Sequence, residues 1–82
     1  MKTRVIYFGK LKDYFGSDPE VIEIDKPCQI QEFVARRFTD KGLPIKEWEP
    51  ILLYAINHTR VFASDWIQPG DELAIMPPLA GG

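Results

Sequence analysis

Only one stretch of this sequence has the spacing of an amphipathic helix, and this limits the folds open to the chain. Four apolar residues fall at offsets of zero, three, four and eight, on one helical face: Ile30, Phe33, Val34 and Phe38. Gly42 followed by Pro44 predicts the end of this helix. A single helix covers one face of a sheet and leaves the other uncovered.

Segments rich in β-branched and aromatic residues predict the sheet. They are residues 3–8, 21–24, 51–57, 60–62 and 72–76, separated by turn-forming stretches at 9–19, 57–59 and 69–71. Residues 43–50 are predicted to be a loop with at most one short turn. The nearly continuous apolar run from 51 to 56 predicts a strand buried on both faces.

The element order predicts an α+β fold of the β-grasp, ubiquitin-like type, in which a mixed sheet packs on one main helix. The first and last strands are expected to lie adjacent and parallel, because a helix-containing crossover separates them. We expect one domain over residues 1–76 and a flexible tail over residues 77–82.

Composition excludes several classes of protein. Ten basic and twelve acidic residues among 82 give a net charge of −2, without the basic excess of a nucleic-acid binder. The apolar run at 51–56 is far shorter than the roughly 20 residues that span a bilayer. A single cysteine indicates the cytoplasm, because small domains of oxidising compartments usually carry several.

The sequence also lacks the usual catalytic and metal-binding patterns. One histidine, His58, and one cysteine, Cys28, are too few for a zinc site of three or four protein ligands. Gly9 and Gly16 are too far apart for a phosphate-binding loop. We therefore expect no metal and no bound cofactor.

The C-terminal residues are the most informative part of the chain. Pro77 and Pro78 cannot donate to a sheet ladder, so the last strand must end at Met76. The two prolines favour an extended path, and six residues at roughly 3.3 Å each reach up to about 20 Å. Gly81 and Gly82 have no Cβ, which lets such a tail enter a channel too narrow for other residues.

The terminal carboxylate of Gly82 would be the working group of such a tail. It is ionised, with a reference pKa of about 3.5, and is a poor electrophile until it is activated. Adenylation by ATP would activate it, and a sulfur nucleophile would then displace the nucleotide and leave a thiocarboxylate. In this interpretation the protein carries sulfur and is not an enzyme by itself. The alternative is a frayed end that has two glycines by chance.

At this point the chain resembles the small subunit of molybdopterin synthase, a β-grasp sulfur carrier. The resemblance covers nearly the whole chain and is strongest in its C-terminal third. It is carried by the opening strand 5–11, by Ala55-Ile56-Asn57, by Pro69-Gly70-Asp71-Glu72-Leu73-Ala74, and above all by Pro77-Pro78-Leu79-Ala80-Gly81-Gly82.

The resemblance implies that an E1-like activating enzyme adenylates Gly82, which then becomes a thiocarboxylate and passes its sulfur to a cyclic pyranopterin precursor. It also implies that the partner is a large catalytic subunit and that the two form a heterotetramer. The tail residues Leu79, Ala80 and Gly81 would insert into this large subunit. The family often has an aromatic residue at the position of Met76 and an apolar one at the position of Arg60.

Two side chains are expected to form the surface that docks on the partner. Phe8 is out of phase with Val5 and Tyr7, so it should point away from the helix-covered face and form an apolar patch with Met76. The prolines Pro77 and Pro78 should adjoin this patch. Alternatively, each residue is merely a scattered surface hydrophobe.

Other functions remain open on the sequence alone. A thiamine-pathway sulfur carrier shares the fold and the Gly-Gly end, although the Pro-Pro exit argues against it. A ubiquitin-like modifier would join its tail to lysines, and a plain interaction domain would have an inert tail. Cys28, near the start of the helix, could instead carry sulfur as a persulfide, although no basic neighbour in the sequence supports its reactivity.

Overall fold

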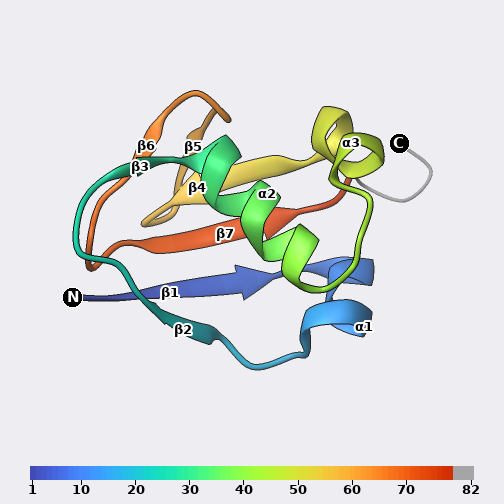
Figure 1. Ribbon diagram of the computed structural model, residues 1–82, viewed down its shortest axis with the longest axis horizontal. Coiled ribbons are helices and arrows are strands. Elements are labelled where there is room, and N and C mark those ends of the chain that lie inside the picture. Colours follow the sequence, from blue (N-terminus) through green and yellow to red (C-terminus); the bar gives the residue numbers. More distant parts are fainter. Residues whose placement is uncertain (79–82) are drawn as a thin grey trace.

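The computed structural model describes residues 1–78, and its dominant feature is a five-stranded sheet crossed on one face by a long helix (Figure 1). The sheet has the strand order β2-β1-β7-β4-β5, and a separate two-stranded ribbon pairs β3 with β6. The strands are β1 (Lys2–Tyr7), β2 (Glu20–Glu23), β3 (Cys28–Gln29), β4 (Leu53–Ile56), β5 (Thr59–Val61), β6 (Trp66–Ile67) and β7 (Glu72–Met76). The helical segments are η1 (Gly9–Leu11), α1 (Lys12–Phe15), α2 (Ile30–Asp40), α3 (Ile45–Trp48) and η2 (Glu49–Ile51).

The first and last strands, β1 and β7, lie side by side and run parallel. Their register pairs Val5 with Leu73 and Tyr7 with Ile75. β2 continues the sheet beyond β1, and β4 continues it beyond β7, both in antiparallel pairing. The predicted adjacency and direction of the outer sequence elements are confirmed, and so is the α+β β-grasp arrangement.

The apolar stripe of α2 packs against this sheet and forms the core. The residues that the helical spacing singles out are all buried: Ile30, Phe33, Val34 and Phe38. The alternating residues of β1 and β7 that meet them are buried as well: Val5, Tyr7, Leu73 and Ile75. Burying one large apolar side chain contributes about 1.5–3 kcal/mol, so this one interface is a major source of stability.

The end of α2 shows why a glycine follows it. Gly42 has a φ of 73°, a left-handed conformation that glycine adopts without a Cβ clash. Its N–H donates to the Thr39 carbonyl at 2.9 Å, and the N–H of Leu43 donates to the Phe38 carbonyl at 2.9 Å. This pair of bonds is a Schellman motif, which satisfies the last carbonyls of the helix.

The predicted strand at 51–57 is shorter than expected, and its burial differs. β4 begins at Leu53, because Ile51 belongs to η2. Tyr54 is buried in the core, whereas Leu53 and Ala55 on the opposite side are only half-buried. The expected burial on both faces is therefore wrong. The apolar run instead reflects an open sheet face that carries apolar side chains.

Several short elements fill stretches that were expected to be loop. Residues 9–15 form η1 and α1, residues 45–51 form α3 and η2, and the ribbon β3–β6 pairs Cys28 with Ile67. No helix within residues 1–78 is both long and apolar enough to span a bilayer. β7 ends at Met76, and the division into a domain and a tail stays a prediction, since residues 79–82 lie outside the described part of the chain.

Candidate functional site

The open face of the sheet presents apolar side chains next to the point where β7 ends. Because Ile75 and Tyr54 point into the core, their neighbours Met76 and Leu53 point to the opposite face, and these two are register partners. On the other side of β7, the N–H of Phe8 donates to the Ile75 carbonyl at 3.1 Å and extends the parallel pairing by one residue. Phe8, Met76 and Leu53 therefore lie across the ends of three adjacent strands.

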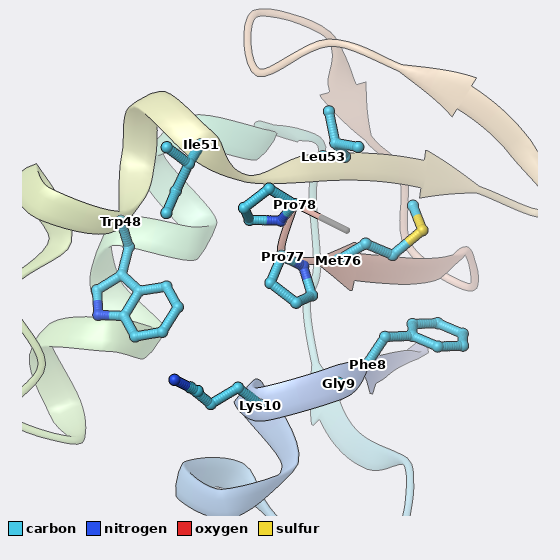
Figure 2. Close-up of a pocket in the computed structure, with 9 residues that line it drawn as sticks. All are labelled: Phe8, Gly9, Lys10, Trp48, Ile51, Leu53, Met76, Pro77 and Pro78. Carbon is cyan, nitrogen blue, oxygen red and sulfur yellow. The ribbon is translucent and has the colours of Figure 1, made fainter. Parts of the chain in front are cut away.

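These strand ends form one side of a groove with a volume of about 830 Å³ (Figure 2). We call it the exit groove. It is lined by Phe8, Gly9, Lys10, Trp48, Ile51, Leu53, Met76, Pro77 and Pro78. Its lining is almost wholly apolar, apart from the Lys10 side chain at the edge. A groove of this size and chemistry accommodates apolar side chains of another molecule.

The two prolines that leave β7 run between two walls of this groove. Extending the register of β1 with β7 by two residues places Gly9 beside Pro77, and extending that of β4 with β7 places Ile51 beside Pro78. Figure 2 shows Pro77 and Pro78 between these segments, with Phe8 and Trp48 at opposite ends of the groove. The base of the C-terminal tail is thus part of the groove itself.

Trp48 is held in place from behind by aromatic contacts. Its ring lies 6.0 Å from that of the core residue Phe38 and 5.9 Å from that of Tyr14, both in edge-on geometry. Such pairs contribute about 0.5–1.5 kcal/mol beyond the buried area. The indole is therefore anchored to the core while part of it lines the groove.

Cations stand around the open face. Arg60 of β5 is the register partner of Ala55, and its guanidinium lies 5.7 Å from the centre of the Phe62 ring. Arg4 pairs with Glu72 at 3.4 Å. Arg60 and Lys10 take part in no ion pair within residues 1–78. Both exposed charges are available to an acidic surface.

The structure brings together four of the eight residues that the sequence predicts for the site. Phe8 is 43% exposed, points away from the core as expected, and lines the exit groove with Met76, Pro77 and Pro78. The other four residues lie outside the described part of the chain: Leu79, Ala80, Gly81 and Gly82.

Sequence reasoning missed the second wall of the groove. Trp48 comes from a stretch that was expected to be a loop, whereas Ile51 and Leu53 come from a strand that was expected to be buried on both faces. The spacing of Ile45 and Trp48, three residues apart, was the available signal of a helical turn. Gly9 and Lys10 carried no pattern that pointed to the groove.

Cys28 does not have the environment of a reactive thiol. It is half-buried in β3, and burial together with the nearby Glu32 carboxylate raises the pKa of its thiol. A raised pKa lowers the fraction of thiolate, which is the nucleophilic form. Among residues 1–78 no three side chains of His, Cys, Asp or Glu are grouped so that they could hold a metal ion.

Comparison with known proteins gives a consistent picture over the full chain. A model described as the ThiS family matches residues 5–82. Molybdopterin synthase sulfur carrier subunits are similar: that of Escherichia coli is 27% identical over 81 residues, with 96% of this chain and 98% of the relative covered. That of Haemophilus influenzae is 29% identical over 80 residues, with 95% and 96% covered.

Solved structures share the fold. The small archaeal modifier protein 1 of Haloferax volcanii superposes with a TM-score of 0.72 at 15% identity, with 95% of this chain and 98% of that chain covered. A chain from the complex of subunits 1 and 2 of the molybdopterin-converting factor of Helicobacter pylori gives a TM-score of 0.64 at 24% identity, with both chains fully covered.

Proposed function

Since the chain belongs to the ThiS family, we propose that it acts as the sulfur carrier subunit of a molybdopterin synthase. The observation that carries this proposal is similarity along nearly the whole chain to subunits with that role in several organisms. The exit groove supports it, because it gathers Phe8, Met76 and the two prolines at the point where the chain leaves the sheet. A carrier needs a docking surface beside its reactive arm.

The reactive group in this proposal is the carboxylate of Gly82. An oxygen of this carboxylate attacks the α-phosphorus of ATP, which gives an acyl adenylate and releases pyrophosphate. A sulfur nucleophile, hydrosulfide in the simplest case, then displaces AMP, which keeps the departing oxygen, and leaves a thiocarboxylate. Its sulfur next forms a carbon–sulfur bond to the cyclic pyranopterin precursor in exchange for a carbon–oxygen bond of the precursor, whose oxygen leaves with the bonding electrons. Water then cleaves the bond between the sulfur and the Gly82 carbonyl carbon and restores the carboxylate.

Two partners follow from this chemistry. An E1-like adenylating enzyme supplies the ATP site, since the described residues offer no phosphate-binding loop. The large subunit of the synthase supplies the site in which sulfur is transferred, and the complex of two subunits known for the Helicobacter pylori relative supports a partner of this kind. We place both reactions in the cytoplasm.

We propose that the exit groove is where the large subunit docks. The groove is continuous with the base of the tail, so a partner that receives the tail must also cover Pro77 and Pro78. Apolar lining such as Phe8 and Trp48 provides the kind of aromatic anchor that dominates protein interfaces. The exposed cations Lys10 and Arg60 predict carboxylates on the opposing surface.

The proposal is tested by blocking the end of the tail. A variant with one alanine added after Gly82 keeps the whole fold and docking surface but replaces the glycine carboxylate by a peptide bond. In a reconstituted reaction with the activating enzyme, ATP, a sulfur source, the large subunit and the precursor, we expect the wild-type chain to yield molybdopterin and the extended variant to yield none.

Other outcomes of the same experiment point to other functions. Full activity of the extended variant, with its extra alanine still present by mass, would contradict the proposal. Isopeptide conjugates to lysines of other proteins would favour a ubiquitin-like modifier. Sulfur delivered to thiazole synthesis but not to the pyranopterin would favour a thiamine-pathway carrier.

A further inference from the structure

Gly9 lies close against Pro77 at the base of the tail. Gly9 follows Phe8 at the end of β1 and has a φ of 57°, in the left-handed region. A Cβ placed on Gly9 would lie 3.0 Å from Cγ and 3.6 Å from Cδ of Pro77. Carbon atoms make their best contacts at about 3.5–4.0 Å, so a side chain at this position would displace the proline ring.

We infer that Gly9 is a positioning residue for the C-terminal tail, because its missing side chain leaves the space through which Pro77 exits the sheet. The inference rests on the proposed function for its biological meaning, since it concerns the direction of the tail that delivers Gly82. The inference gives Gly9, just beyond the end of β1, a role of its own in a site that otherwise consists of the tail and the exit groove.

The direction of the tail is sensitive to this contact because the strand residues just before Pro77 are held on both sides. The N–H of Phe8 holds the end of β1 against β7 through its 3.1 Å bond to the Ile75 carbonyl, so Gly9 cannot easily move away. On the other side, β4 holds Met76 through its pairing with Leu53. A new atom at Gly9 therefore requires the Pro77 ring to shift by a few tenths of an ångström, which changes the direction in which the chain leaves β7.

A small rotation at Pro77 becomes a large displacement at the end of the chain. The five residues 78–82 span up to about 17 Å when extended, so a turn of about 10° at Pro77 shifts the mean position of the tip by at most about 3 Å. Misplacement by about 1 Å can lower the rate of a reaction about 100-fold when geometry controls it. The expected effect is thus on the rate of the tail's chemistry.

A simpler role for Gly9 is that of a turn glycine needed only for its positive φ. Gly42 provides a matched comparison, because it also has a positive φ, of 73°. Among residues 1–78, however, a Cβ placed on Gly42 would meet no atom within 4 Å beyond its chain neighbours. Alanine at either site introduces backbone strain. Only alanine at Gly9 also meets Pro77.

The experiment compares four variants with the wild-type chain: Gly9→Ala, Gly42→Ala, Pro77→Ala and the double variant Gly9→Ala/Pro77→Ala. The first readout is kcat/KM for thiocarboxylate formation by the activating enzyme. We expect Gly9→Ala to lower it at least about tenfold and Gly42→Ala to change it less than about twofold. Pro77→Ala removes the Cγ atom that the new Cβ meets, so Gly9→Ala should have little further effect in that background.

The second readout is structural and needs no partner. Residual dipolar couplings of the Leu79 amide in the free protein report the orientation of the chain beyond Pro78, and we expect them to change in Gly9→Ala but not in Gly42→Ala. If Gly9→Ala unfolds the chain, Gly9→Asn replaces it in both measurements, because asparagine tolerates a positive φ but still has a Cβ.

The outcomes separate this inference from the proposed function. Equal couplings and equal rates in Gly9→Ala and Gly42→Ala would overturn the positioning role. Rate losses in Gly9→Ala that persist undiminished in the Pro77→Ala background would overturn it as well. If the couplings change as expected but even the wild-type chain forms no thiocarboxylate, the positioning role stands and the proposed function fails.

Discussion

Two buried phenols connect single residues to the stability of the whole fold. The Tyr7 hydroxyl donates to Glu20 Oε1 at 2.6 Å, and Arg37 reaches the other oxygen of that carboxylate at 2.6 Å, so β1, β2 and α2 are joined by one polar network. Tyr54 is only 3% exposed, and its hydroxyl has no hydrogen-bond partner within residues 1–78. The Tyr7 hydroxyl is thus part of a hydrogen-bonded network, whereas the Tyr54 hydroxyl is buried without a hydrogen bond within residues 1–78.

Both phenols predict a loss of stability in alkaline solution. Burial and, to a lesser degree, the Glu49 carboxylate raise the pKa of Tyr54 to about 12, and burial together with Glu20 raises the pKa of Tyr7. The unfolded chain releases these protons near pH 10, before the folded protein does. Stability is therefore fully present below pH 10 and falls as the pH rises toward about 12.

The variant Tyr54→Phe tests this prediction. Its free energy of unfolding, measured by urea titration at pH values from 8 to about 12, should fall less steeply than that of the wild-type chain. The difference should reach about 2 kcal/mol at the upper end, because each pKa unit corresponds to about 1.4 kcal/mol. Parallel curves for the two proteins would show that Tyr54 ionises as freely when folded as when unfolded.

At the scale of the residue, the sequence best predicts the role of a side chain that stabilises its own turn. Asn57 begins the predicted turn at 57–59 and has a φ of 48°. Its side chain accepts the Glu72 N–H at 3.0 Å and donates to Asp71 at 3.1 Å. Gly9 looked like an ordinary turn residue. Its contact with Pro77, 68 positions away, follows only from the register of β1 with β7.

At the scale of the element, length decides what the sequence reveals. α2 has 11 residues, enough for its apolar spacing to repeat, and its extent was predicted closely. α3 has four residues and η2 three, so neither contains a full repeat, although together they form one wall of the exit groove. The two-residue strands β3 and β6 exist because the loops that carry them meet, and no local pattern marks them.

The exit groove, which lies at the ends of three adjacent strands, leads to a prediction about docking. We expect Phe8→Asp to weaken binding to the large subunit by about 10–100-fold, because it places a carboxylate where an apolar contact forms. Its free energy of unfolding should change by less than about 0.5 kcal/mol, since Phe8 is exposed. Isothermal titration calorimetry and urea titration measure the two quantities.

Val21→Asp is the matched control for this change. Val21 is also an exposed apolar residue, on the outer strand β2, but it does not line the exit groove. This variant should bind the large subunit as the wild-type chain does. If both variants bind equally well, the groove is not the docking surface, and if Phe8→Asp unfolds, Phe8 has a structural role that its exposure does not reveal.

At the scale of the whole molecule, the fold brings the end of β1 and the turn that precedes β4 to the point where β7 ends. The parallel pairing of β1 with β7 places Phe8 and Gly9 there, and the antiparallel pairing of β4 places Ile51 and Leu53 there. A sheet covered by one helix keeps its other face open for a partner. The fold class was predictable from the sequence, whereas the groove depends on this long-range register.

The measurement that tests the central claim most directly is the intact mass of the protein after incubation with ATP, a sulfur source and the activating enzyme, followed by fragmentation. We predict that one oxygen is replaced by sulfur, only when ATP is present, and that fragments place the change at Gly82 in both the wild-type chain and Cys28→Ala. An unchanged mass, or an added sulfur that is found on Cys28 and disappears in Cys28→Ala, would contradict the account.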